Sequence, residues 1–283
     1  MKTINSLSGG KTSSYIAVNF PADIEMFSLV CIECHNAAGE WLKKRPDLIR
    51  YANEKLEDYI PLYGEFRATA EDPVIIQTMM ELEQKIGREI IWVRGISFDH
   101  LIQKSKFLPN SKTRFCTSEM KLKPIFEWCF LNTGLPVRMR LGYRFDESHR
   151  KDKATTEYEF PVSCNTYGQR RQNLKTFEWR INEFPLIDEV PTIHPQVVNY
   201  WKNSNDVTFA DDSNCQMCFF KEAQQKLINY EKHPNIMLWA AIQEQLIGAT
   251  FNKNISLLSN FKIAKLDFFS GGGSGCNAGF CHD

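Results

Sequence analysis

The chain has 283 residues, enough for one large domain or for one domain with an appendage. Hydrophobic residues make up 43% of the chain, so a packed core is expected rather than disorder. Lys and Arg together number 34, as do Asp and Glu. This balance argues against a protein that coats polyanions in general, although it does not exclude a local basic groove.

The sequence predicts no signal peptide and no transmembrane helix. Its longest apolar stretch, residues 24–33, is too short to span a bilayer and contains charged residues. A cytoplasmic protein without a membrane partner is therefore expected. In a reducing compartment, nine cysteines favour metal binding or redox chemistry over a disulfide framework.

Strand and helix patterns alternate through the first half of the chain. The predicted strands are residues 2–8, 24–33, 88–95 and 136–145, and the predicted helices are 11–20, 37–56 with a break at Pro46, 73–87 and 121–134. Gly87 and Gly134 end two of these helices. The alternation predicts an α/β fold with a doubly wound, mostly parallel sheet, in which ligands bind at the carboxyl ends of the strands.

The pattern changes after residue 150. Residues 150–188 show no clean period and are predicted to form long functional loops. Helical patterns return at 194–204 and 221–248, and the end of the chain is rich in glycine. We therefore expect an α/β nucleotide-binding domain over residues 1–190. A helical, cysteine-bearing C-terminal region would cover residues 191–283.

A glycine pair followed by a lysine lies at the first strand–helix junction, within Ser8–Ser13. Backbone N–H groups at such a turn and at the helix N-terminus form an anion cradle, and Lys11 adds a positive charge. The alternative is an ordinary capped turn. A Walker A loop is rejected because its first glycine would have to stand at Asn5.

The shorter pattern Ser-Gly-Gly-Lys-x-Ser resembles the pyrophosphate loop of the PP-loop superfamily. That superfamily includes the adenine nucleotide alpha-hydrolases and the phosphoadenosine phosphosulfate (PAPS) reductase-like family. The stretch 107–125 resembles a second family segment, with matches at Pro109, Arg114, Cys116, Lys121 and Pro124. The stretch 141–150 resembles a third, with matches at Gly142, Arg144, Glu147, Ser148 and Arg150. Residues 184–201 resemble the segment that follows, so the four segments occur in order along residues 1–240.

The resemblance implies a Rossmann-like fold that binds an adenine nucleotide, either ATP or PAPS. The residues then expected to contact the nucleotide or its phosphates are Ser8, Gly9, Gly10, Lys11, Thr12, Ser13, Glu33, Arg114, Lys121, Gly142, Arg144, Glu147, Ser148 and Arg150. Arginine suits this role because it binds oxyanions with two parallel hydrogen bonds and stays charged. Residues 138–180 contain ten Lys or Arg against six Asp or Glu, which favours an anionic substrate, nucleic acid included.

Thr12 departs from the family pattern. Many PP-loop ATPases have Asp at this position, where a carboxylate helps to hold Mg²⁺, and threonine is a poorer ligand for a hard cation. Mg²⁺ remains a candidate cofactor, but the difference moves weight toward the reductase-like branch, in which a metal is not obligatory.

Two cysteine pairs in the C-terminal region predict a metal site made by Cys215, Cys218, Cys276 and Cys281. Four thiolates suit tetrahedral Zn²⁺ or an iron–sulfur cluster, and reduced thiols without a ligand are the alternative. The stretch 215–222 resembles the cysteine-bearing region of PAPS reductase-like proteins, some of which carry a four-iron cluster. An iron–sulfur cluster is therefore favoured over zinc.

Other cysteines offer alternative roles. Sulfonucleotide reductases attack a sulfuryl group with a tail cysteine in a Glu-Cys-Gly-Leu-His motif, and Cys281-His282 resembles part of it. Cys116 could join a cluster or form a persulfide. Cys31 and Cys34 lie at the end of a predicted buried strand and are expected in the core, with Glu33 as a candidate for the nucleotide pocket.

These observations leave three functions open. The first is an ATP-dependent enzyme that adenylates an acceptor, such as a nucleobase or nucleic acid, for sulfur insertion, with a sulfur-donor protein as partner. The second is a PAPS reductase that uses Cys281 and a thiol reductant. The third is a nucleotide-binding module that regulates a partner and catalyses nothing. In the enzyme hypotheses, Lys11, Cys116 and Cys281 are the candidate catalytic residues.

Overall fold

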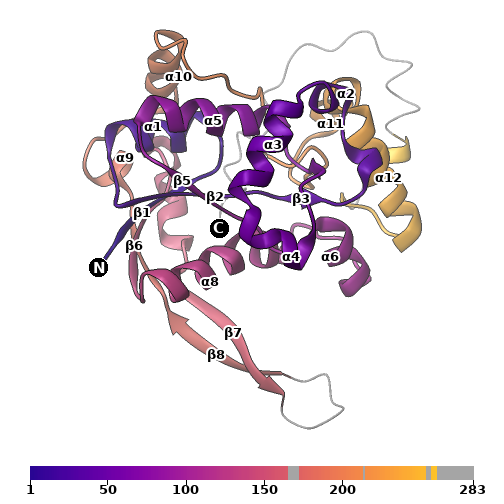
Figure 1. Ribbon diagram of the computed structural model, residues 1–283, viewed down its shortest axis with the longest axis horizontal. Coiled ribbons are helices and arrows are strands. Elements are labelled where there is room, and N and C mark those ends of the chain that lie inside the picture. The colour runs from indigo at the N-terminus through magenta and orange to yellow at the C-terminus, as the bar shows by residue number, and fades with distance from the viewer. Residues whose placement is uncertain (165–171, 213, 253–255, 260–283) are drawn as a thin grey trace.

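A parallel sheet of five strands forms the centre of the protein (Figure 1). The computed structural model describes residues 1–164, 172–212, 214–252 and 256–259. The sheet order is β5-β2-β1-β6-β9, and the bounds are β1 (Thr3–Leu7), β2 (Ile24–Ser28), β5 (Ile90–Val93), β6 (Val137–Arg140) and β9 (Arg180–Glu183). All four neighbouring pairs are parallel. The predicted α/β class with a parallel sheet is confirmed.

Helices connect the strands and continue beyond the sheet. The α-helices are α1 (Lys11–Asn19), α2 (Glu40–Lys43), α3 (Pro46–Lys55), α4 (Ile60–Tyr63), α5 (Val74–Ile86), α6 (Phe98–Ser105), α7 (Phe115–Thr117), α8 (Lys123–Asn132), α9 (Pro185–Asp188), α10 (His194–Lys202), α11 (Ala223–Lys232) and α12 (Pro234–Ile247). Short 3₁₀ segments lie at His35–Ala37, Glu57–Tyr59 and Phe145–Lys153, and a π-helical turn at Ser118–Leu122 leads into α8. The helical C-terminal region is thus present as predicted.

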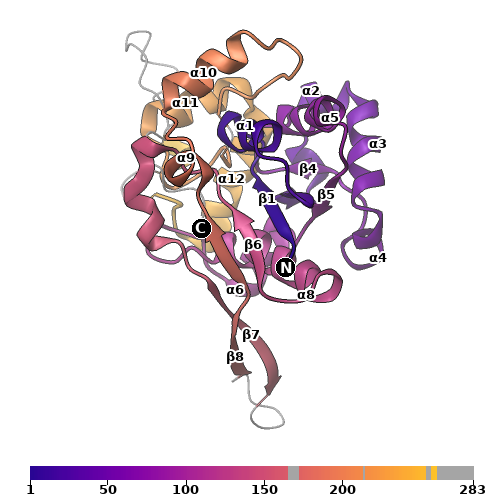
Figure 2. The same ribbon diagram turned by 90° about the vertical axis from the view of Figure 1, so that its left-hand side faces the viewer.

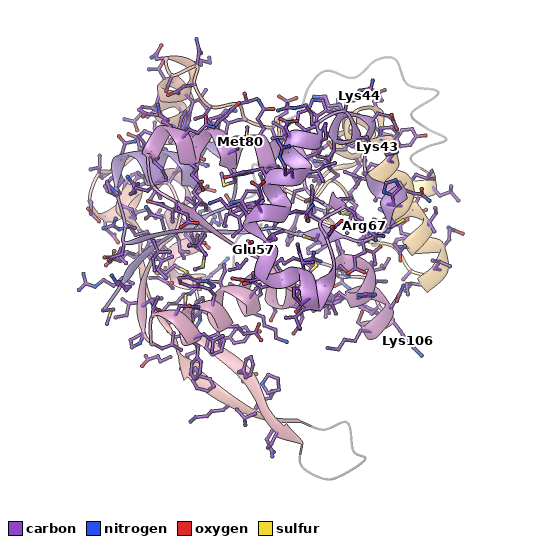
Figure 3. All side chains as sticks on the ribbon, in the orientation of Figure 1. Lys43, Lys44, Glu57, Arg67, Met80 and Lys106 are labelled. Atoms are coloured by element: carbon purple, nitrogen blue, oxygen red, sulfur yellow. The ribbon has the colours of Figure 1, made fainter. Side chains whose placement is uncertain are left out.

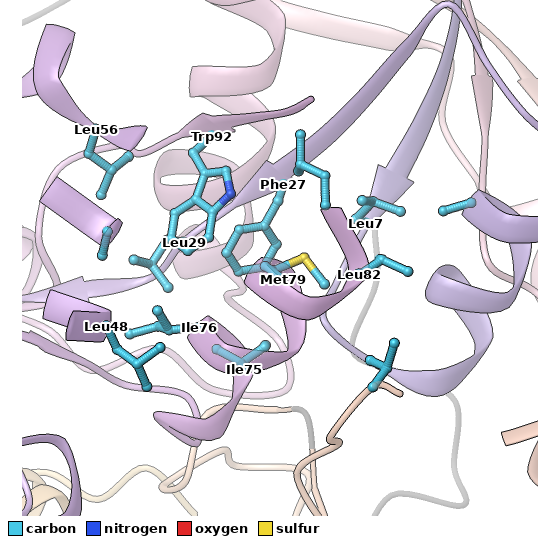
Figure 4. Packing of buried hydrophobic residues seen from close by; sticks show 14 of the residues in the cluster. Leu7, Phe27, Leu29, Leu48, Leu56, Ile75, Ile76, Met79, Leu82 and Trp92 are labelled. Carbon is cyan, nitrogen blue, oxygen red and sulfur yellow. The ribbon is translucent and has the colours of Figure 1, made fainter. Parts of the chain in front are cut away.

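Apolar side chains cover both faces of the sheet because alternate strand residues point in opposite directions. On one face, Phe27 and Leu7 pack with residues of α1, α3 and α5, and the rings of Phe27 and Trp92 lie 4.9 Å apart (Figure 4). On the other face, Ile4 and Met26 pack against α8. Helices on both faces make this a doubly wound arrangement.

The predicted strand at 24–33 is wrong in its length. Its ladder with β5 ends where the N–H of Leu29 donates to the carbonyl of Val93. The chain then leaves the sheet, and β3 (Cys31–Ile32) pairs antiparallel with β4 (Ala68–Thr69). The apolar run at 24–33 is therefore divided between the parallel sheet and the β3–β4 pair.

The predicted loop at 150–188 is also wrong, because it contains a long hairpin and the fifth strand of the sheet. The hairpin consists of β7 (Glu157–Cys164) and β8 (Gln172–Glu178), and it extends away from the sheet (Figure 2). Its base packs on α8, where the ring of Phe126 lies 4.9 Å from Tyr158 and 5.5 Å from Phe177. The predicted helix at 221–248 is divided at Pro234, which has no N–H to donate.

No helix in the described part of the chain combines the length and the apolar character needed to span a membrane. Charged side chains surround the protein (Figure 3), and Lys44, Arg67 and Lys106 are among the exposed ones.

We expect Gly9→Ala to destabilise the fold by at least about 2 kcal/mol. Gly9 has a φ of +73°, and an added Cβ would lie 1.9 Å from Cγ1 of Ile75 in the core of α5. The control is Gly87→Ala, where φ is +61° but nothing lies within 4 Å of the added Cβ. Chemical denaturation should show a larger loss for Gly9→Ala, and equal losses would contradict the close contact.

Candidate functional site

The Gly-rich turn lies at the carboxyl end of β1 and leads into α1. The side chain of Ser13 forms its hydrogen bonds within the turn itself. Ser13 Oγ donates to the carbonyl of Gly10 and accepts from the N–H of Ser8, both at 3.1 Å. Gly10 is the N-cap residue of α1 and makes no side-chain cap. The first N–H groups of α1 can therefore serve an anion, as the sequence predicts for a phosphate loop. We call residues Ser8–Ser13 the phosphate loop.

A cavity of about 270 Å³ opens beside the phosphate loop. We call it the phosphate-loop pocket. It brings together ten of the predicted nucleotide-contacting residues, which are Ser8, Gly10, Lys11, Thr12, Ser13, Lys121, Gly142, Arg144, Glu147 and Arg150. Segments far apart in sequence reach one cavity because the strands β1 and β6 are neighbours and end at the same edge.

Arg144 and Arg150 are held by acidic residues of their own segment. Glu147 accepts from Arg144 Nη1 at 3.1 Å and from Arg150 Nη1 at 3.0 Å. Asp146 accepts from Arg144 Nε at 3.1 Å, and Arg144 Nη1 also donates to Thr12 Oγ1 at 3.2 Å. Burial opposes ionisation of Asp146, but Arg144 outweighs it and lowers the pKa of that carboxyl. The arginines are thus oriented toward the loop before any ligand binds.

The ring of Tyr143 packs against the guanidinium of Arg150. The guanidinium carbon lies 4.1 Å from the centre of the Tyr143 ring, and Arg150 is buried. A stacked, ion-paired guanidinium keeps one geometry, which favours bidentate binding of an oxyanion.

Lys121 pairs with a buried carboxylate between two pockets. Its Nζ lies 2.8 Å from Oε1 of Glu71, a residue with no exposed surface. Lys121 lines the phosphate-loop pocket and also a second cavity on its other side, and Thr117 and Asn214 do the same. The two cavities are therefore adjacent.

Three cysteines line the second cavity, which we call the thiol pocket. Cys116 comes from α7, and Cys215 and Cys218 come from the segment before α11. Burial raises the pKa of Cys116 to about 11 and that of Cys215 well above its ordinary value. The other lining residues are mainly apolar or aromatic, and they include Phe98, Met120, Met217, Phe219, Phe220 and Phe251. Arg114 lies here as well, over the ring of Phe220.

The described residues do not by themselves complete a metal site. Within the parts of the chain that the structure describes, no group of three or more His, Cys, Asp or Glu residues is placed to hold a metal ion. Two of the four predicted ligands, Cys276 and Cys281, lie outside the described residues. The two predicted ligands that are described, Cys215 and Cys218, both line the thiol pocket.

Four predicted nucleotide-contacting residues do not line the phosphate-loop pocket. Oε1 of Glu33 lies 3.9 Å from Nη2 of Arg94 and 3.5 Å from Nδ1 of His100. Arg114 lines the thiol pocket instead. Gly9 and Ser148 belong to segments that line the phosphate-loop pocket, but they do not line it themselves.

The cysteines around Glu33 lie apart from both pockets. Cys31 is buried, and burial raises the pKa of its thiol to about 12, whereas Cys34 is partly buried. Cys31 is thus a core residue, as the strand position indicated.

Several further residues that line the phosphate-loop pocket were not predicted from the sequence, and they include Arg180, His194, Asp211 and Asn214. Arg180 is buried at the start of β9, a strand that the sequence pattern did not reveal. Asp211 and Asn214 lie shortly before Cys215, and this proximity to a predicted metal ligand is a hint that could have identified them.

No family model, no curated protein and no solved structure matches this chain.

We expect Glu147→Gln to lower the unfolding free energy by about 2 kcal/mol, because two largely buried arginines lose their shared carboxylate. The control is Asp188→Asn, which breaks a half-exposed ion pair with Lys151 and should leave stability nearly unchanged. Urea unfolding followed by tryptophan fluorescence measures both. A Glu147→Gln protein as stable as the control would show that the Arg144–Glu147–Arg150 cluster adds nothing to the fold.

Proposed function

We propose that this chain is a PAPS reductase-like member of the PP-loop superfamily that binds ATP in the phosphate-loop pocket and adenylates an acceptor for sulfur transfer. The observation that carries the proposal is the adjacency of the two pockets. Thr117, Lys121 and Asn214 line both, so a nucleotide at the phosphate loop would lie next to the thiols.

The proposed reaction has two steps, adenylation of the acceptor and displacement of AMP by sulfur. An oxygen of the acceptor attacks the α-phosphorus of ATP, and pyrophosphate leaves. A sulfide-level sulfur from a donor then attacks the activated carbon, and AMP leaves with the former acceptor oxygen. Lys11 and the N–H groups of α1 would stabilise the phosphates, and Arg144 and Arg150 would hold the nucleotide in line.

Three cations of the phosphate-loop pocket are already paired with carboxylates. Arg144 and Arg150 share Glu147, Arg144 also pairs with Asp146, and Lys121 is paired with Glu71. Mg²⁺ would partly neutralise a triphosphate bound there, so we propose ATP as the nucleotide and keep PAPS as the alternative.

The proposal includes an iron–sulfur cluster held by Cys215, Cys218, Cys276 and Cys281, with zinc as the alternative metal. Cys116 faces the same pocket as the first pair. A cluster there would supply a binding place or electrons for sulfur chemistry. Iron and sulfide analysis of anaerobically purified protein tests this part, and stoichiometric zinc in colourless protein would replace the cluster with a structural site.

We expect calorimetry to show tighter binding of ATP than of adenosine 3′,5′-bisphosphate, and Lys11→Met to weaken ATP binding at least about tenfold, because one charged contact to phosphate is lost. Lys44→Met, which changes an exposed lysine elsewhere, is the control and should bind like the unaltered protein.

These titrations, together with an assay for pyrophosphate release, separate the alternative functions. Preference for the bisphosphate would favour the PAPS reductase that uses Cys281. ATP binding without pyrophosphate release, tested with candidate nucleobase and nucleic-acid acceptors, would favour a regulatory module. Binding of neither nucleotide would contradict the proposed function.

A further inference from the structure

Helix α10 lies against α1, although the two are far apart in the chain (Figures 1 and 2). The rings of Tyr15 and Tyr200 meet edge to face, with centroids 4.9 Å apart. This contact places the C-terminal end of α10 beside the first turn of α1, where the phosphate loop ends.

Trp201 forms a hydrogen bond to the phosphate loop. Its indole N–H donates to the backbone carbonyl of Lys11 over 2.8 Å. The ring is 5% exposed and is held on several sides, by Tyr200 and Phe209 through edge contacts and by the ammonium of Lys85 at 5.8 Å. A side chain so restricted gives its hydrogen bond a fixed direction.

The residues after α10 contact the side chain of Lys11 as well. The Lys11 ammonium lies 5.6 Å from the centre of the Phe209 ring. The chain then continues along the phosphate-loop pocket through Ala210, Asp211 and Asn214 and reaches Cys215 in the thiol pocket. Both the backbone and the ammonium of Lys11 are therefore contacted by a segment outside the parallel sheet.

We infer that Trp201 is a positioning residue for the phosphate loop: its indole N–H fixes the first turn of α1 and thereby sets the affinity of the loop for phosphates. This inference rests on the proposed nucleotide binding at that loop. It adds a dependence that the loop motif does not contain, since the residue responsible lies on α10. Trp201 needs no contact with the nucleotide to act in this way.

Trp92 provides a matched control. It is buried to a similar degree in the same apolar cluster, and its indole N–H has no hydrogen-bond partner among the described residues. Trp92→Phe and Trp201→Phe thus remove the same atoms from the same core, but only Trp201→Phe removes a hydrogen bond to the loop.

The test measures dissociation constants for ATP and for inorganic pyrophosphate in the full-length variants. Trp201→Phe should raise both constants about three- to tenfold and by the same factor, because the effect acts on phosphates alone. Trp92→Phe should leave both unchanged even if it loses as much stability. Hydrogen exchange should also be faster in Trp201→Phe than in Trp92→Phe at the amide of Ser14, which donates to the carbonyl of Gly10.

Equal dissociation constants in the two variants, with equal exchange in α1, would overturn the positioning role while nucleotide binding still stood. If the unaltered protein bound neither ATP nor pyrophosphate, the proposed function would fail first, and the positioning role would fail with it. A loss for ATP without a loss for pyrophosphate would also overturn the inference, since it would place the effect away from the phosphates.

Discussion

The close packing of Gly9 against Ile75 is the contact on which the candidate site depends. Ile75 belongs to α5, and α5 is fixed by the core that includes Phe27 and Leu7. Because Gly9 has no side chain, the loop lies directly on α5, and α1 begins at a defined place above the end of β1. The hydrogen bonds from Arg144 and Trp201 to the loop require the loop to lie at this place.

Two other segments meet the loop once it is so placed. Arg144 reaches Thr12 from the segment after β6, and Trp201 reaches the carbonyl of Lys11 from α10. Gly142, in the same segment as Arg144, lies close to the loop as well, since an added Cβ would come within 3.4 Å of the backbone of Ser13. The loop is thus contacted by residues of three segments that lie far apart in the chain.

The buried pair of Lys121 and Glu71 connects this loop region to the cysteines. A carboxylate without exposed surface is costly unless a cation compensates it, and Lys121 compensates Glu71 between the two pockets. The pair places charge at the boundary of the thiol pocket, whose lining is mainly apolar or aromatic. That boundary is the physical basis for proposing that nucleotide and sulfur chemistry belong to one reaction.

The sequence by itself determined the α/β class, the position of the loop, the helix that ends at Gly87 and the division of the C-terminal helices from the sheet, because these follow from local periodicity and glycine chemistry. It did not reveal β7 and β8, whose alternation is interrupted at Pro161 by a bulge. Only the tertiary structure decided that Arg180 and Asp211 line the phosphate-loop pocket and that Trp201 donates a hydrogen bond to the loop. It also showed that Cys116 faces the Cys215 pair. Contacts between distant segments depend on strand order and on how helices pack, and neither leaves a periodic trace in the chain.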